Sequence, residues 1–125
     1  MIDKKLLEVL STTPDAALAI VTRGPEGPHM VNSWNSYVQI NGEGELLIPA
    51  GRMHETEKNI RRDPRVQLTI CNREVEGLRY RGTGFLLTGE ARFTDRGSDF
   101  ETVKARYPWA RAVLAVKILT AEQTL

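Results

Sequence analysis

Apolar residues follow two different periods along the chain, and the change from one to the other predicts the secondary structure. Alternating or continuous apolar runs bounded by Gly, Pro, Asn or Asp are typical of β-strands, whereas spacings of three and four residues are typical of amphipathic helices. Asp3 and Ser98 are suitable caps for the first and last helix, and a proline ends each one. In chain order, the predicted elements are a helix over 3–10, strands over 16–22, 27–40 and 46–49, a helix over 54–62, strands over 65–72 and 85–94, a helix over 99–107, and a strand over 112–119.

This order of elements predicts a mainly β (α+β) chain, an antiparallel sheet with short helices. Tight turns join the first three strands, so we expect them to form an antiparallel meander. Gly89 interrupts a long strand and predicts a bulge, which would help a small sheet curl into a barrel. The charged, glycine-broken segment 74–81 predicts a loop or a poorly paired hairpin. A length of 125 residues predicts one domain over 1–125.

The stretch 27–37 is unusual because both of its faces carry amides and hydroxyls. Alternation places Ser33 and Asn35 on one face, and Asn32 and Trp34 on the other. We interpret it as a pocket wall that offers donors, acceptors and an aromatic surface. The alternative is a half-exposed strand with Trp34 at a sheet edge.

A second polar stretch begins at Gly51, which permits a sharp turn from strand to helix. The start of the following helix presents unpaired backbone N–H groups, which attract anions. Arg52, Thr56 and Lys58 add a guanidinium, a hydroxyl and an ammonium. This pattern predicts a phosphate cradle without P-loop spacing, and the alternative is a helix start with surface charges and an outward-pointing Thr56. A phosphate bound there would place an attached planar group against residues 32–35.

Composition excludes several other function classes. The net charge of +1 gives no electrostatic footprint for nucleic acid or an anionic membrane. No apolar run is long enough for a membrane span or a secretory leader, so we expect a cytoplasmic protein. The single cysteine, Cys71, excludes an intramolecular disulfide, and its strand-like neighbours predict a small buried residue. Two histidines, His29 and His54, disfavour a protein-only zinc site and are expected to be structural or solvent-facing.

Taken together, these stretches resemble the small FMN-binding proteins of sulfate-reducing bacteria. The resemblance covers nearly the whole chain and rests on segments 27–37, 51–59, 82–86 and 121–125. More widely, Thr56-x-Lys58-Asn59 followed by Asp63-Pro64-Arg65-Val66 is similar to the flavin-binding split-barrel superfamily that includes pyridoxamine-phosphate oxidase.

The resemblance implies a split β-barrel homodimer that binds one FMN per subunit without a covalent bond. It also implies roles for individual residues. The isoalloxazine and ribityl chain would be flanked by Asn32, Ser33, Trp34 and Asn35, and the ring would have Pro49, Ala50 and Gly51 beside it. The phosphate would be held by residues 53–56, from Met53 to Thr56, the flavin of the other subunit would be reached by Trp109 and Leu125, and Asp15 would lie near the cofactor. Two positions depart from the family pattern, because Arg52 replaces a glycine and Glu55 replaces a lysine. A carboxylate beside a phosphate is unfavourable, so Arg52 or Lys58 would supply the positive charge.

Three functions remain open. The first is a small FMN redox or electron-transfer protein, which is favoured because no general acid or base stands out. The second is a flavin-dependent oxidase or reductase of the pyridoxamine-phosphate-oxidase type. It needs a second anion site, for which residues 79–81 (Arg-Tyr-Arg) are the candidate. The third is a non-enzymatic module that binds flavin or haem.

The last predicted strand, over 112–119, is apolar on both faces, with Lys117 as the exception. A strand buried on both sides in so small a chain predicts a partner surface beyond the chain's own core. Together with the resemblance, this favours a homodimer.

Overall fold

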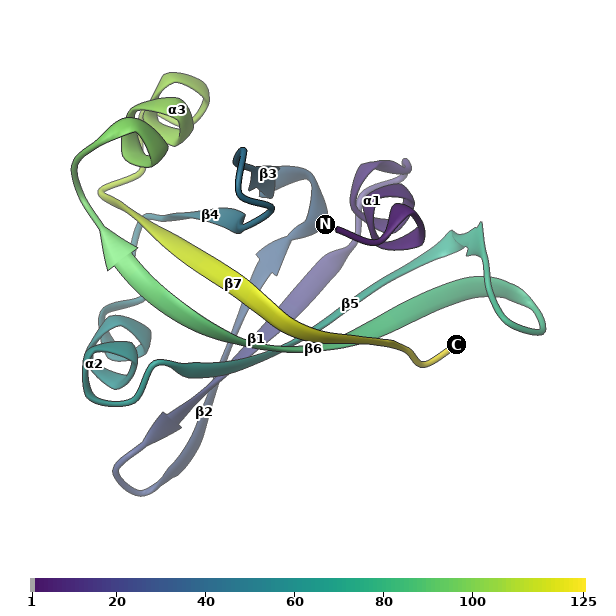
Figure 1. Cartoon of the computed structure of the whole chain (residues 1–125), viewed down its shortest axis with the longest axis horizontal. Coiled ribbons are helices and arrows are strands. Elements are labelled where there is room, and N and C mark those ends of the chain that lie inside the picture. Colours follow the sequence, from purple (N-terminus) through teal and green to yellow (C-terminus); the bar gives the residue numbers. More distant parts are fainter. Residues whose placement is uncertain (1) are drawn as a thin grey trace.

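The computed structural model describes residues 2–125 and shows an antiparallel sheet with three short helices around it (Figure 1). The sheet has seven strands in the order β2-β1-β5-β6-β7-β4-β3, which confirms the mainly β fold. The elements are α1 (Lys4–Ser11), β1 (Ala17–Gly24), β2 (Gly27–Trp34), the 3-10 turn η1 (Asn35–Tyr37), β3 (Gln39–Ile40), β4 (Leu46–Ala50), α2 (His54–Arg62), β5 (Arg65–Glu76), β6 (Arg81–Thr94), α3 (Ser98–Arg106) and β7 (Ala112–Gln123).

Two local signals work as predicted, whereas the cap expected at Ser98 is wrong, because Ser98 is the first residue of α3 and its N-cap, Gly97, has no side chain to accept a hydrogen bond. The Asp3 carboxylate accepts hydrogen bonds from the backbone N–H groups of Lys5 and Leu6, and so caps α1. The β6–β7 register shifts at Gly89, where an added Cβ would lie 2.4 Å from the carbonyl oxygen of Lys117. The bulge at Gly89 is therefore confirmed, and it needs glycine because the two backbones approach closely.

The predicted meander is wrong, because the strand expected over 27–40 breaks at Asn35. β2 pairs only with β1, and β3 pairs only with β4, so the two halves of that stretch stand at opposite ends of the sheet. A three-residue turn, η1, connects them. Two edges joined by so short a link must lie close together, so the sheet is curled into a barrel that is split between β2 and β3.

Side-chain contacts hold η1 in place at this split. The Asn35 amide donates to the carbonyl oxygens of Cys71, at 2.8 Å, and Val9, at 3.4 Å. Asp15 accepts hydrogen bonds from the backbone N–H and the hydroxyl of Ser36. The turn is therefore tied at its start to β5 and α1 and at its centre to the segment before β1.

Two expectations about burial are wrong, because the position of a residue in its strand or helix, and not its apolar character, decides whether its side chain points to the core. Ile70 and Asn72 point inward, so Cys71 between them is exposed and is not the small core residue that we expected. In α1, the spacing of Leu6, Leu7 and Leu10 predicts the buried face, but Val9 is buried and Leu7 is 37% exposed, so the apolar face is rotated from the predicted one.

The strands β5, β6 and β7 are each longer than predicted. Segment 74–81 belongs to the β5–β6 hairpin, whose register shifts between Asn72 and Glu76, so the poorly paired hairpin was the better alternative. β7 continues to Gln123, and most of the predicted tail therefore pairs with β6.

The partner-surface argument from β7 fails over the first half of the strand. Leu114 and Val116 face the barrel core, whereas Val113 and Ala115 form a second cluster with Val103 of α3. Both faces of β7 are therefore covered within one chain over residues 112–116, so this apolar segment gives no argument for a dimer, whereas Leu119 beyond it is 54% exposed.

We expect Asn35→Asp to destabilise the fold by at least about 3 kcal/mol at pH 7, because a buried carboxylate would face two carbonyl oxygens. The loss should shrink as the pH falls, since protonation restores a donor. Urea unfolding at pH 7 and at acidic pH measures both effects. The control is Asn32→Asp, on the exposed face of β2, which should cost about 1 kcal/mol or less. Equal losses for both variants would contradict the role given to Asn35.

Candidate functional site

The connection from β4 to α2, residues 51–56, is called the α2 start here. Met53 in this segment has φ 67° and ψ 35°, a left-handed conformation that costs a residue with a side chain about 1–2 kcal/mol. No side chain within residues 2–125 caps α2, so its first N–H groups have no helical or side-chain acceptor. Because the helix dipole adds partial positive charge at this end, the α2 start suits an anion.

Arg111 fixes the shape of the α2 start. Its guanidinium donates to the carbonyl oxygens of Gly51, at 3.1 Å, and Arg52, at 2.7 Å, and to the Glu57 carboxylate, at 2.7 Å. The backbone N–H of Arg111 donates to Ala50. One side chain thus ties the turn to the first turn of α2 and to the start of β7. The sequence offered no signal for this contact, since about sixty residues separate the partners.

Glu57 is the acidic partner in this arrangement. Hydrogen bonds from Arg61 and from Arg111 hold the pKa of the Glu57 carboxyl below its usual value of 4.5. Arg61 is the larger cause, but its side chain is 67% exposed and solvent screens it, whereas Arg111 is 32% exposed. We therefore attribute more of the stabilisation to Arg111.

The charged side chains of Arg52, Glu55 and Lys58, around the α2 start, differ in their availability to a ligand. Lys58 pairs with Glu55 at 3.4 Å, and both are exposed. Arg52 is also exposed, and its guanidinium forms no ion pair with any residue in 2–125. Glu55 therefore partly neutralises Lys58, and Arg52 is the cation that a ligand at this helix end would meet.

Thr56 is placed differently from either expectation. Its side chain is fully buried, so the hydroxyl does not point outward. The same burial prevents direct contact with a ligand in this conformation, and the hydroxyl has no hydrogen-bond partner within residues 2–125. An unpaired buried hydroxyl is costly, and a polar group entering the α2 start would supply a partner if the covering atoms moved.

An aromatic cluster borders the α2 start. The rings of Tyr37, Tyr107 and Trp109 lie with their centroids 5.0–5.7 Å apart. Trp109 packs on Gly51, where an added Cβ would lie 3.2 Å from the indole. The Tyr107 hydroxyl donates to the carbonyl oxygen of Ser36. Half of Trp109 remains exposed, so the cluster offers an aromatic surface beside the helix end.

The predicted residues of β2 divide by face. Asn32 and Trp34 are exposed, whereas Ser33 and Asn35 are buried. The Asn35 amide is already bonded to two carbonyls, so its expected role beside a ligand is corrected to a structural one. The start of β2 lies close to α2. Residues 24–28 and His29, at that end of β2, line a cavity of about 260 Å³ together with Glu55 of α2.

The structure brings together only part of the predicted set. Gly51, Arg52 and Met53 form one site with Trp109. Pro49 and Ala50 precede it in β4 with buried side chains, so they shape the site from behind. Leu125 lies elsewhere, at the end of the β5–β6 hairpin.

Within residues 2–125 no helix has the length and apolar character needed to cross a membrane. The same residues hold no group of three or more His, Cys, Asp or Glu side chains placed to bind a metal ion.

Comparison with known proteins adds a family and a fold. The pyridoxamine 5'-phosphate oxidase family matches residues 2–124. The FMN-binding protein of Nitratidesulfovibrio vulgaris (strain DSM 19637 / Miyazaki F) is 44% identical over 125 residues, the full length of both chains. HupZ of Group A Streptococcus superposes with a TM-score of 0.79 at 15% identity, covering 99% of this chain and 100% of that one. An FMN-binding protein of Syntrophomonas wolfei gives a TM-score of 0.65 at 13% identity, covering 86% and 76%.

Arg111→Met should lower the free energy of unfolding by roughly 1–3 kcal/mol at pH 7, because Glu57 and two carbonyls lose a charged donor. A lowered carboxyl pKa stabilises the fold above the unfolded value of 4.5, and this contribution is lost as the pH falls through the folded pKa. The deficit of the variant should therefore shrink below pH 4.5. Urea unfolding across this range is the measurement.

Arg61→Met is the matched control, and it should cost about 1 kcal/mol or less because that side chain is exposed. A deficit for Arg111→Met that is the same at all pH values would contradict the coupling to Glu57.

Proposed function

Because the chain belongs to the pyridoxamine 5'-phosphate oxidase family, we propose that it binds FMN without a covalent bond and acts as a small flavin redox protein. The observation that carries the proposal is the uncapped α2 start, with the free Arg52 guanidinium and an aromatic surface beside it. A full-length relative whose name states FMN binding supports it.

The α2 start fits the phosphate of FMN. A terminal monophosphate would accept hydrogen bonds from the free N–H groups of the helix, and Arg52 would add charge-assisted donors. Met53 has a left-handed backbone conformation, which costs free energy. Backbone strain of this kind is typical of binding sites. Arg111 holds the two carbonyls of the turn away from the anion.

The aromatic cluster fits the flavin ring. When bound, FMN supplies one- and two-electron redox chemistry. Trp109 and the outer face of β2, with Asn32 and Trp34, offer a planar wall and amide groups to hold and orient a ring. Trp34 and Trp109 are each about half exposed, so a flavin held there would lie near the surface. Such a position supports exchange of electrons with a partner protein.

We further propose a homodimer in which Leu125 completes the flavin site of the other subunit. The twelve residues of β7 separate Trp109 from Leu125 by roughly 36 Å in extended chain. The two ends of the strand accordingly lie on opposite sides of the molecule (Figure 1). One flavin ring cannot touch both residues of a single chain, so the expectation that both reach the other subunit's flavin is revised. Trp109, which packs on Gly51, is assigned to its own subunit's flavin, and Leu125, which is 60% exposed, to the partner's.

The cofactor is tested by denaturing the purified protein and identifying the released compound by absorbance and mass. FMN is the expected result, and FAD, haem or no cofactor would contradict the proposal. Arg52→Ala should weaken FMN binding by about 1.5–3 kcal/mol and leave riboflavin binding nearly unchanged, because riboflavin lacks the phosphate. Titration of the stripped protein with each flavin measures the difference. Arg96→Ala is the control, since Arg96 is 91% exposed and lies after β6.

Light scattering of the FMN-saturated protein should give the mass of a dimer. Leu125→Ala should weaken FMN binding roughly tenfold, which corresponds to the loss of one buried leucine contact. Leu119→Ala removes an exposed leucine from β7 and should change nothing. A monomeric holoprotein with unaltered affinity in Leu125→Ala would remove both the dimer and the role of Leu125.

A further inference from the structure

The outer face of the sheet is bare across five neighbouring strands, β2, β1, β5, β6 and β7. In β1 and β5 buried side chains alternate with more exposed ones, and α1 and α2 pack against the buried set through Leu6, Val9 and Ile60. Val103 of α3 packs on the second cluster, at the start of β7. Within residues 2–125 no helix therefore covers the outer face, and a bare face of this size marks an interaction surface.

The strand registers align the outer side chains in rows that cross all five strands. One complete row takes a single residue from each strand and runs through Asn32, Ala19, Thr69, Leu86 and Glu122. In the row beside it, the hydroxyls of Thr88 and Thr120 form a hydrogen bond with each other, as expected for side chains on one face. β5 supplies the middle residue of each row, with two strands on either side.

The middle strand carries no charge where the rows cross it. Its outer positions there are Gln67, Thr69 and Cys71, which are exposed, and they are bounded by Arg65 and Arg73. Charged residues make up 26% of the chain, so an outer face that served only to meet water should carry several of them. The uncharged run along β5 therefore indicates a surface that another molecule covers.

The strands on either side of β5 are uncharged over the same rows. β1 presents Ala17, Ala19 and Val21, and β6 presents Leu86 and Thr88. Small and apolar side chains let a second sheet approach, since two sheets pack face to face at about 10 Å. The composition of the face fits another sheet of the same kind.

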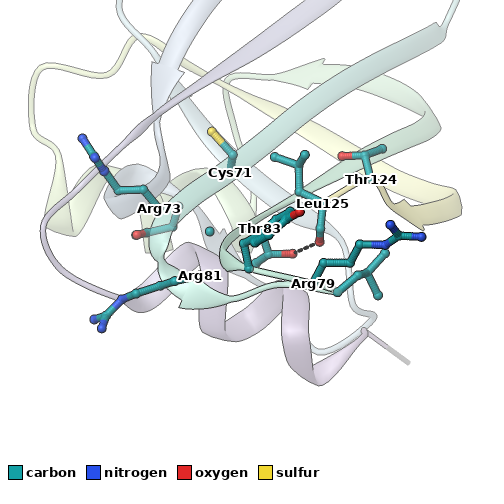
Figure 2. A pocket seen from close by; sticks show the side chains of 11 residues that line it. Cys71, Arg73, Arg79, Arg81, Thr83, Thr124 and Leu125 are labelled. Carbon is teal, nitrogen blue, oxygen red and sulfur yellow. Dashed lines mark hydrogen bonds between the residues drawn. The ribbon is translucent and has the colours of Figure 1, made fainter.

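The two ends of the rows carry the residues that the proposed flavin site takes from two subunits. Trp34 lies at the β2 end and is about half exposed. At the other end Thr124 donates its backbone N–H to the Gly84 carbonyl oxygen, and Leu125 follows it. The Thr83 hydroxyl donates to the Leu125 carbonyl oxygen at 2.8 Å, which fixes the chain end beside β6 (Figure 2). Trp34 and Leu125 thus lie at opposite edges of one face, four strand spacings or roughly 19 Å apart.

We propose that two copies of the chain pack through this face, about a two-fold axis that runs along β5 in the plane between the two sheets. The rotation places β1 over β6 of the partner subunit, and β2 over β7 of the partner subunit. Trp34 then lies beside Leu125 of the partner subunit, and the Asn32 amide faces the carboxylate of Glu122 of the partner subunit, which can accept a hydrogen bond. The interface rests on the proposed function, because it is the surface on which the flavin-sharing homodimer would form.

The axis gives β5 a property that the other strands lack. Each outer residue of β5 meets its own copy, so any charge there would face a like charge. This requirement accounts for the uncharged run from Gln67 to Cys71. Thr69, the middle residue of the complete row, is therefore the position at which a substitution tests the axis.

The experiment is light scattering of FMN-saturated Thr69→Lys and Thr69→Glu over a range of protein concentrations. Each variant should raise the dissociation constant of the dimer about a hundredfold or more, because two like charges would be buried against each other. An equimolar mixture of the two variants should recover the dimer, since an ammonium then meets a carboxylate. The matched controls, Thr102→Lys and Thr102→Glu, change an exposed threonine of α3 and should remain dimers. Circular dichroism and urea unfolding check that each variant is folded.

Cys71 supplies a second readout of the same surface. It is the single cysteine, it is exposed in one chain, and it lies on the proposed axis. Iodoacetamide should alkylate it at least about tenfold more slowly in the wild-type dimer than in the Thr69→Glu monomer, because thiol reactivity needs access. The added carboxylate disfavours the thiolate, so it cannot be the cause of a faster reaction in the variant.

The outcomes separate the interface from the cofactor. Dimers that persist in both Thr69 variants, or a mixture that stays monomeric, would overturn the axis along β5 even in a protein that binds FMN. A monomeric wild-type protein would overturn the dimer and this interface together. If the protein releases no FMN, the proposed function fails, and the same measurements on the protein as isolated still decide the interface.

Discussion

The constraint on which the structure depends is the three-residue turn η1 between the two free edges of the sheet. Because Asn35 leaves the β conformation, the chain crosses from β2 to β3 and the sheet must curl to bring its ends together. The turn is held by Asp15, by the Cys71 carbonyl that accepts from the Asn35 amide, and by the Tyr107 hydroxyl, which come from three separate parts of the chain. These bonds set the width of the split, and with it the position of Trp109 beside the α2 start.

The sequence predicted the elements of the barrel well because their signals are local. The Asp3 cap, the prolines and the Gly89 bulge act over a few residues, and each is found where expected, whereas Ser98 does not cap α3. It failed where the outcome depends on partners far apart in the chain. Neither the break at Asn35 nor the coverage of β7 by α3 leaves a local mark, since each needs a contact made only after the sheet has formed.

In the candidate site, too, residues with a local signal could be predicted, and residues that depend on distant partners could not. Gly51 and Arg52 could be singled out because a strand that ends in glycine before a helix has a known consequence for the backbone. Arg111, which fixes that backbone, looks like any surface arginine in the sequence. Thr56 was chosen for its hydroxyl, yet helix periodicity buries it beside Asn59 and Ile60. A residue's chemistry can be read from its type, but its direction depends on which face of the helix meets the sheet.

Some buried polar atoms of this fold have no hydrogen-bond partner, and each of them lowers the stability of the folded state. Within residues 2–125 they are the side-chain oxygens of Asn35, Gln39 and Thr56. They belong to η1, β3 and α2, which are the elements around the split and the α2 start. Each unpaired group costs about 1–3 kcal/mol, and the left-handed Met53 adds strain in the same region. Such local conflicts are expected where a chain is shaped for binding, because a surface with every group satisfied internally has little to offer a polar ligand. That these costs fall on η1, β3 and the α2 start is an argument, independent of any relative, for the proposed cofactor site at the split.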